Sequence, residues 1–462
     1  MQDLFEKLID KGLKLGAEFI DIRSEETIGT NIKIIDSKLK VGSNFNNIGV
    51  GIRAFIDGAW GFVSSTILEK GHLQDKLKHA VKMAKLITKN SKIKFKLKER
   101  DPVKEKFQSD VKIRISDVDI TEKVKFLEEI DKQAKSFDNR IVNTNSIYSD
   151  AESTVLICNS FGSIIEKRSS HILCVSMNFS KEGNIRQRGF RSIGESRGYE
   201  TILSEGAANI GEESAREAIE LLSAVSVKGG TYTVLLDPKL SSTFIHEAFG
   251  HATEADALVA GESILENKLN KQIGSEFLNV IDDPTIPNLY GSYEVDDEGA
   301  IARRTILIEN GVLKSYLNNL ETASRLNMEG NNARTASFHY YPIVRMSNTH
   351  ISPGDWKFEE MIENIKDGIY AQGWIRGYTD PAIGTFMFKC AKGNIIKNGE
   401  IKELLRDVAI SGETLYTLKQ IDAVGNDLEF TPGHCGKFGQ IVPVADGGPT
   451  IRVKNLVVGG LK

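Results

Sequence analysis

The sequence is poor in cysteine and proline, and it carries no large excess of charge of either sign. Its 462 residues contain 4 cysteines and 10 prolines, and 59 basic side chains stand against 63 acidic ones. Because the cysteines form no CxxC pair, a disulfide scaffold is not expected. The balanced charge excludes a global field that would recruit nucleic acid or an anionic membrane. The scarcity of proline beside 41 glycines indicates tight turns rather than proline-rich linkers.

Long hydrophobic runs are also missing from the sequence. No segment approaches the roughly 20 consecutive apolar residues that a helix needs to cross a bilayer. The N-terminal segment carries acidic residues early, unlike a signal peptide, and it predicts an amphipathic helix. The apolar face of this helix would hold Leu4, Phe5, Leu8, Ile9 and Leu13. We therefore expect a soluble, cytoplasmic protein whose partners include neither a membrane nor nucleic acid.

Residues 1–225 are predicted to form an α+β domain with two similar sheet–helix halves. In each half a strand-like alternation precedes a helical pattern, at 18–56 and 73–87 and again at 141–188 and 213–225. Two such units in the same order are typical of a domain made of paired halves. Between them, residues 92–98 alternate lysine with apolar residues, which predicts a strand whose lysine face lies in solvent.

Residues 226–462 are predicted to form a strand-rich, barrel-like domain with a few helices, which completes an α+β fold. The apolar strand expected at 231–236 leads into Asp237 and Pro238, which suit the N-cap and the first position of a helix. Dipeptides typical of tight turns recur in this half at Asn310-Gly311, Asn398-Gly399 and Asp446-Gly447. The segments around the first two predict β-hairpins.

The most informative segment is His246-Glu-Ala-Phe-Gly-His251, on the helix that would begin at Asp237. Two imidazoles beside a glutamate are the arrangement of a metal hydrolase, in which the histidines bind the ion and Glu247 handles the proton of water. On a regular α-helix, side chains five positions apart diverge by about 140° and cannot bind one ion. We therefore predict a π-type irregularity at Ala248–Gly250, since glycine resists such a distortion least.

A catalytic zinc ion usually takes a third protein ligand, and Cys435 is the best candidate for it. Glycines on both sides let the backbone approach an ion, and no apolar run in the sequence buries the thiol. The adjacent His434 is an alternative, although neighbouring side chains on an extended segment point to opposite faces. The other cysteines lie in apolar strands and are expected in the core: Cys158, Cys174 and Cys390. Two neutral imidazoles and one thiolate would leave zinc with a net charge of about +1, enough to acidify water for Glu247.

A few further residues are open to more than one interpretation. Glu254 and Asp256 could orient the ligating imidazoles, or they could belong to a solvated helix face. His339 and His350 are expected to be ordinary strand histidines. The glycine-rich segment 433–440 lacks the GxxxxGK spacing of a phosphate-binding loop, so nucleotide binding is rejected.

Several longer motifs carry a resemblance to a known family: HEAFGHATEAD at 246–256, GHCGKFGQIVPVADGGPTIRVKNLVVGG at 433–460 and GVGIRAFIDGAWGFVSS at 49–65. Over essentially its whole length, the chain resembles the TldD-type metallopeptidases of the TldD/PmbA (TldE) family. The resemblance implies that His246, His251 and Cys435 bind zinc and that Glu247 is the catalytic residue. It also implies extended peptides and unfolded protein segments as substrates, reached through a chamber between subunits. A homodimer, or a heterodimer with a TldE/PmbA-like subunit that lacks the histidine motif, is expected.

These observations predict a zinc-dependent metallopeptidase in which Glu247 activates the water that attacks a peptide carbonyl. Two other hypotheses stay open: a non-catalytic or assembly subunit with a structural metal, and a metal hydrolase of non-peptide amides. A cysteine peptidase with Cys435 as its nucleophile is a weaker hypothesis, because it leaves the His-Glu-His pattern unexplained.

Overall fold

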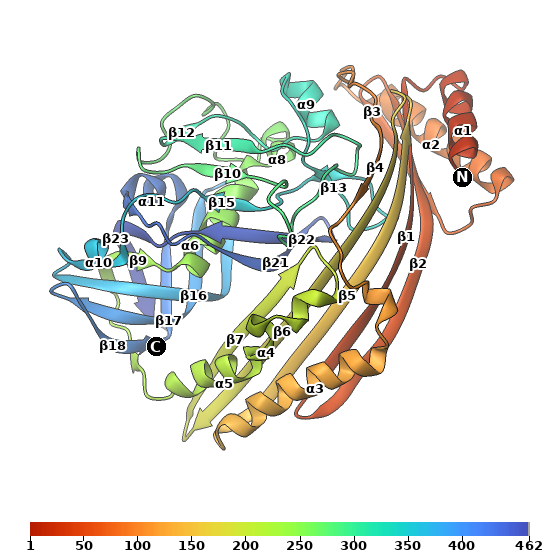
Figure 1. The fold of residues 1–462 in the computed structure, drawn as a ribbon. Helices are drawn as coiled ribbons and strands as arrows, with labels where there is room; N and C mark the ends of the chain where they lie inside the picture. The colour runs from red at the N-terminus through yellow and green to blue at the C-terminus, as the bar shows by residue number, and fades with distance from the viewer. Residues whose placement is uncertain (461–462) are drawn as a thin grey trace.

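The structure is a computed structural model that describes residues 1–460, and the first half of the chain builds one long, twisted sheet (Figure 1). The strands run in the order β3-β2-β1-β5-β6, and both β4 and β7 pair with β6. Their bounds are β1 (Phe19–Ile35), β2 (Lys38–Ile56), β3 (Ala59–Ser65), β4 (Lys104–Gln108), β5 (Ile141–Asn159), β6 (Ile164–Glu182) and β7 (Ile185–Glu195).

The main helices of this half pack against one face of the long sheet. Ile20 and Ile22 of β1 lie in a core cluster with α1 and α2, whereas Ile32 and Ile34 lie in a cluster with α3 and α5. Because side chains alternate along a strand, these four residues share one face, and the other face is left to meet the second half of the chain. The helices are α1 (Gln2–Lys14), α2 (Lys70–Asn90), α3 (Ile120–Phe137), α4 (Glu205–Ala208) and α5 (Ile210–Glu220), with short 3₁₀ turns at Ile115–Asp117 and Tyr199–Leu203.

The predicted order of strands followed by a helix occurs twice, as β1-β2-β3-α2 and as β5-β6-β7-α5, and α1 precedes the first set as predicted. Helix α3, which precedes the second set, was not predicted. The N-terminal helix buries Phe5, Leu8 and Ile9, as its apolar pattern predicts. The placement of Leu13 on that face is wrong, because its side chain is 38% exposed. Gly12 completes the buried face instead. The helix packs so closely on β1 here that a Cβ at Gly12 would come within 2.8 Å of the Ile20 side chain.

The strand predicted at residues 92–98 is not formed. Phe95 and Leu97 do pack against the cluster around Phe55, and Lys94, Lys96 and Lys98 are exposed, so burial alternates over residues 94–98, whereas Ile93 is exposed. However, the backbone N–H of Lys98 donates to Ser324 Oγ at 2.8 Å rather than to a neighbouring strand. The prediction was wrong because an extended segment that packs on an apolar surface buries alternate side chains even when its backbone pairs with no other strand.

In the second half of the described residues, five strands close into a barrel, which confirms the predicted barrel-like, strand-rich region of an α+β fold. β9 and β17 both pair with β16, and the ring continues through β23 and β19. The barrel strands are β9 (Gly230–Leu236), β16 (Asp367–Asp380), β17 (Thr385–Lys397), β19 (Val408–Glu413) and β23 (Ile451–Gly460), with β8 (Val225–Ser226), β18 (Glu400–Arg406) and β20 (Ile421–Val424) attached.

A second sheet of this half, here called the central sheet, runs in the order β12-β11-β10-β15-β22-β21. Its strands are β10 (Val280–Asp282), β11 (Thr305–Glu309), β12 (Val312–Leu313), β15 (Thr349–Ile351), β21 (Glu429–Lys437) and β22 (Gln440–Gly448), and a small pair is formed by β13 (Ala333–Arg334) and β14 (Ile343–Val344). β21 stands at the end of the strand order, so this strand forms an edge of the central sheet.

Two of the three predicted tight turns are confirmed. Asn310-Gly311 joins β11 to β12 and Asn398-Gly399 joins β17 to β18, with positive φ at both residues of each pair, as a type I′ turn requires. The turn at Asp446-Gly447 is wrong, because both residues lie inside β22. Gly447 serves close packing there, since a Cβ would come within 2.6 Å of the His350 side chain.

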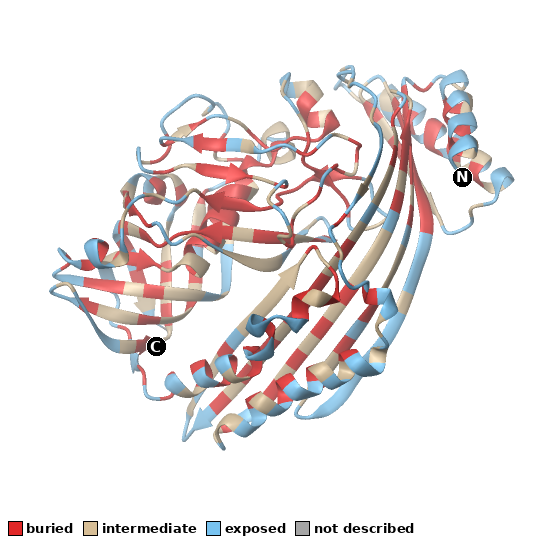
Figure 2. Ribbon diagram, viewed as in Figure 1, coloured by how far each residue is buried: buried red, intermediate tan, exposed pale blue. Residues whose placement is uncertain are grey.

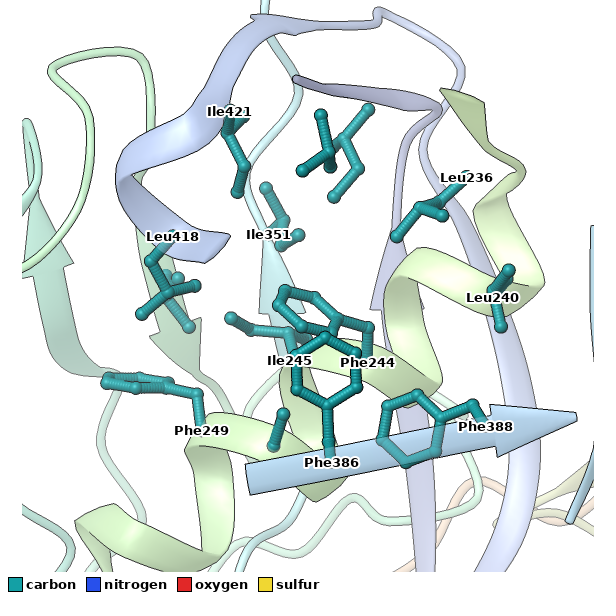
Figure 3. Close-up of a cluster of buried hydrophobic side chains, with 14 of the residues drawn as sticks. Leu236, Leu240, Phe244, Ile245, Phe249, Ile351, Phe386, Phe388, Leu418 and Ile421 are labelled. Atoms are coloured by element: carbon teal, nitrogen blue, oxygen red, sulfur yellow. The ribbon is translucent and has the colours of Figure 1, made fainter. Parts of the chain in front are cut away.

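Helix α6 (Pro238–Phe244) lies between the barrel and the central sheet, with contacts to β16 on one side and β22 on the other. Its residue Phe244 is fully buried and packs edge-on against Phe386 of the barrel, with ring centroids 5.2 Å apart (Figure 3). Figure 2 shows how burial concentrates around this helix and the central sheet. The remaining helices are α7 (His251–Thr253), α8 (Ala255–Ala260), α9 (Leu320–Leu326), α10 (Phe358–Ile362) and α11 (Thr414–Gln420). Within residues 1–460, no helix is long and apolar enough to cross a membrane.

Candidate metal centre

The helix that carries the histidine motif begins as the sequence predicts. The Asp237 carboxylate accepts a hydrogen bond from the Leu240 N–H at 2.8 Å and another from the Gly373 N–H of β16 at 2.9 Å. Burial raises the pKa of Asp237 to about 6, although both of these hydrogen bonds oppose that rise. The cap therefore ties the start of α6 to the barrel.

The helix changes from α to π at the histidine motif, over residues Ile245–Gly250. This confirms the irregularity predicted at Ala248–Gly250. The wider turn brings His246 and His251 to the same side, with ring centroids 5.1 Å apart and ring planes at 89°. Gly250 packs directly against the buried Met346, and only glycine fits here. A Cβ at this position would stand 3.2 Å from Met346 Cε and overlap Sδ.

Cys435 of β21 meets the two histidines. Its Sγ is 3.2 Å from His246 Nε2 and 3.6 Å from His251 Nε2, and the three donor atoms all lie within 4.8 Å of one another. Ligands of a tetrahedral zinc ion, with bonds of about 2.0–2.3 Å, stand about 3.5 Å apart, so this nitrogen and sulfur set fits such an ion. The expectation of an unburied thiol is wrong: Cys435 is only 4% exposed, because β21 and β22 form a hairpin that places it against the histidine helix.

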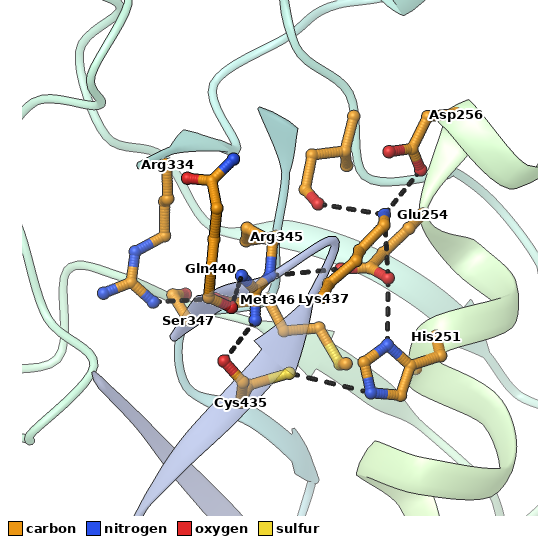
Figure 4. A network of polar contacts seen from close by, with 12 residues as sticks. His251, Glu254, Asp256, Arg334, Arg345, Met346, Ser347, Cys435, Lys437 and Gln440 are labelled. Atoms are coloured by element: carbon orange, nitrogen blue, oxygen red, sulfur yellow. Dashed lines mark hydrogen bonds and ion pairs between the residues drawn. The ribbon is translucent and has the colours of Figure 1, made fainter. Parts of the chain in front are cut away.

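Each imidazole has a carboxylate at its second nitrogen. His251 Nδ1 lies 2.9 Å from Glu254 Oε2 (Figure 4), and His246 Nδ1 lies 2.6 Å from Asp446 Oδ1, although the latter contact is not aligned as a hydrogen bond. In metal sites, contacts of this kind fix an imidazole ring so that its other nitrogen faces the ion. Sequence reasoning missed Asp446, because the Asp-Gly pair was interpreted as a turn. For Glu254, the orienting interpretation fits the contact, whereas Asp256 binds Lys437 Nζ at 2.7 Å and touches neither imidazole.

The charges of these groups depend on one another. Burial raises the pKa of the Cys435 thiol, but the two imidazoles outweigh it and bring the pKa down to about 6. Burial lowers the pKa of His251, but Glu254 and Cys435 raise it to about 10, and Asp446 and Cys435 likewise raise the pKa of His246. Burial acts to raise the pKa of Glu254, but Lys437 and His251 bring it to about 2. Cys435 is therefore stabilised as a thiolate, the form that binds metal ions.

Glu247 lies beside the donor atoms, with Oε2 3.8 Å from His251 Nε2. Its side chain is 32% exposed, whereas those of His246 and His251 are 3% and 15% exposed. The carboxylate therefore stands on the solvent side of the donor set, within reach of a molecule that approaches the centre.

The other candidates lie away from the donor atoms. His434 is exposed on the opposite face of β21, and its Nε2 lies 3.2 Å from the Tyr290 hydroxyl. Both residues line a polar cleft of about 390 Å³ beside the long sheet. His350 lies in β15 as expected, whereas His339 lies in an exposed turn rather than a strand. Cys158, Cys174 and Cys390 are buried in strands and free, as expected.

Models of one protein family match most of the chain. The PmbA/TldA metallopeptidase domain 1 matches residues 20–87, the central domain residues 113–222 and the C-terminal domain residues 229–460. The chain belongs to the PmbA/TldA metallopeptidase family. This family is the TldD/PmbA group that the sequence motifs resemble.

Individual PmbA/TldA relatives agree with the family match. A metalloprotease of Methanocaldococcus jannaschii is 38% identical over 96% of this chain and 97% of its own length. A protein of Saccharolobus solfataricus named as a zinc metalloprotease TldD homolog is 31% identical over 98% of this chain and 99% of its own length. Among solved structures, TldE from Thermococcus kodakarensis has the same fold, with a TM-score of 0.79, 20% identity and coverage of 99% of this chain and 100% of that chain.

Proposed function

We propose that the chain is a zinc-dependent metallopeptidase in which His246, His251 and Cys435 hold the ion. The observation that carries the proposal is the convergence of their donor atoms within 4.8 Å, with Glu247 beside them. Imidazole and thiolate donors suit zinc, and three protein ligands leave the fourth position open, as in catalytic rather than structural sites.

The residues of the chain divide the chemistry among them. The zinc ion, when bound, supplies Lewis-acid chemistry that polarises a carbonyl and acidifies water. The Glu247 carboxylate accepts the proton of the attacking water and returns it to the leaving amine nitrogen. Asp446 and Glu254 hold the two imidazoles in the orientation that presents Nε2.

We propose extended peptides and unfolded protein segments as substrates. β21 carries Cys435 and forms an edge of the central sheet, and an extended peptide can pair with a sheet edge through its backbone. Backbone pairing of this kind selects little for side chains, which fits unfolded chains.

The expected partner is a second subunit, either another copy of this chain or a TldE/PmbA-like protein, because a solved TldE shares the fold. The cytoplasm is the proposed location, since the four cysteines are free and buried, as is usual in a reducing compartment.

Glu247→Gln tests the catalytic proposal, with Glu262→Gln as a matched control on an exposed glutamate beyond the centre. We expect the first variant to lose about 10²–10⁴-fold in the cleavage of an unstructured peptide mixture while its zinc content is unchanged, because only the proton carrier is removed. Equal cleavage by both variants would favour a structural metal. Cleavage of simple amides but not of peptides would favour the hydrolase of non-peptide amides.

A further inference from the structure

Arg345 follows β14 and is buried completely beside the metal centre, in contact with both sides of it (Figure 4). We propose that Arg345 is a positioning residue that sets the distance between Cys435 and His251 and thereby the geometry of the metal site. This inference rests on the proposed metal-binding function and names a residue that touches neither the ion nor a substrate.

On the side of β21, the guanidinium holds the backbone next to the thiolate. Arg345 Nη2 donates to the carbonyl oxygen of Cys435, and Nη1 donates to the carbonyl oxygen of Gln440 at 3.2 Å. These two carbonyls belong to the two strands that meet at the Phe438-Gly439 turn. The position of Cys435 along the hairpin is therefore fixed by a group outside the hairpin.

On the side of the histidine helix, the same guanidinium faces Glu254. Arg345 Nε lies 3.9 Å from Glu254 Oε1, and within residues 1–460 neither atom has a hydrogen-bond partner. The other oxygen of Glu254 is occupied by His251 Nδ1 at 2.9 Å and by Lys437 Nζ at 3.1 Å. Arg345 thus links the backbone carbonyl of Cys435 to the carboxylate of Glu254, which orients the imidazole of His251.

The chemistry of this position requires arginine. A planar guanidinium carries donors in fixed directions and can serve two carbonyls and a carboxylate at once, whereas a lysine ammonium cannot span them. Two cations, the buried Arg345 and the partly buried Lys437, face the carboxylates of Glu254 and Asp256, so these four side chains are balanced in charge. The backbone N–H of Arg345 donates to the Asn332 carbonyl at 2.9 Å, and this hydrogen bond anchors Arg345 independently of the metal centre.

Arg345→Lys tests the inference, with Arg334→Lys as the control. Arg334 is also buried, and its guanidinium also donates to two backbone carbonyls, those of Met346 and Pro443, but it contacts neither a donor residue nor Glu254. We would measure zinc affinity by competition with a chelator and the visible absorption spectrum of the cobalt(II)-substituted protein. The spectrum reports ligand geometry, which a residue that only stabilises the fold would leave unchanged.

We expect Arg345→Lys to bind zinc about 10–100-fold more weakly and to shift the cobalt spectrum, with Arg334→Lys like the wild type. Zinc affinity within twofold of the wild type, with an unchanged spectrum, would overturn the inference and leave the proposed function standing. A wild-type protein that binds neither metal would overturn both. If Arg345→Lys does not fold, Glu254→Gln breaks the same link from the other side, and an unchanged zinc affinity in that variant would equally refute the role of Arg345.

Discussion

Replacement of Gly250 by alanine probes the packing that holds the π-helical segment in place. The new Cβ would stand 3.2 Å from Met346 Cε and overlap Sδ, whereas carbon contacts are comfortable at about 3.5–4.0 Å. Because Met346 is fully buried, the displacement is overpacking and costs about 1–3 kcal/mol. Alanine in a helix returns about 0.5–1 kcal/mol relative to glycine, so the net fall in the free energy of unfolding should lie between about 0 and 2.5 kcal/mol, centred on about 1 kcal/mol.

A double-mutant cycle separates these two effects. Met346→Ala removes the obstructing thioether, and in that background Gly250→Ala should raise the free energy of unfolding by about 0.5–1 kcal/mol. The measurement is urea unfolding of the metal-free protein, with shifts in midpoint at constant slope. Zinc affinity should also fall in Gly250→Ala and recover in the double variant, because His251 follows directly. If Gly250→Ala had the same effect in both backgrounds, the packing argument would be refuted.

One further prediction concerns a residue on the β21–β22 hairpin. Asp446→Asn removes the charge beside His246 Nδ1 and should weaken zinc binding about 10–100-fold; an affinity within twofold of the wild type would show that the contact orients nothing.

The features that sequence reasoning could predict are those encoded over a few neighbouring residues. The spacing of His246 and His251 admits a shared ion only if the helix is wider than an α-helix, and the π segment follows from that constraint. The Asn-Gly hairpins follow in the same way, because both residues of such a turn adopt positive φ.

The partners of the histidines depend on contacts between distant segments. Asp446 belongs to the centre because β22 pairs with β21 so that Val442 lies opposite Cys435, and alternation then turns Val442, Val444 and Asp446 to the same face. The turn that sets this register, Phe438-Gly439, has no Asn-Gly or Asp-Gly signal. The role of Arg345 is still harder to predict from the sequence. Nothing in the neighbouring residues indicates that its guanidinium reaches the carbonyl of Cys435, 90 positions away.

The three donor atoms of the centre come from segments far apart in the chain, since Cys435 follows His246 by 189 residues. A ribosome makes the histidine helix long before it makes β21, so a growing chain carries both imidazoles for most of that interval without the thiolate. Closure of the centre must wait until β22 has paired with β21 and brought Cys435 back to the helix. The order of synthesis thus separates the making of the helix from the completion of the centre, and a chain cut anywhere between the two segments would retain only part of its donor set.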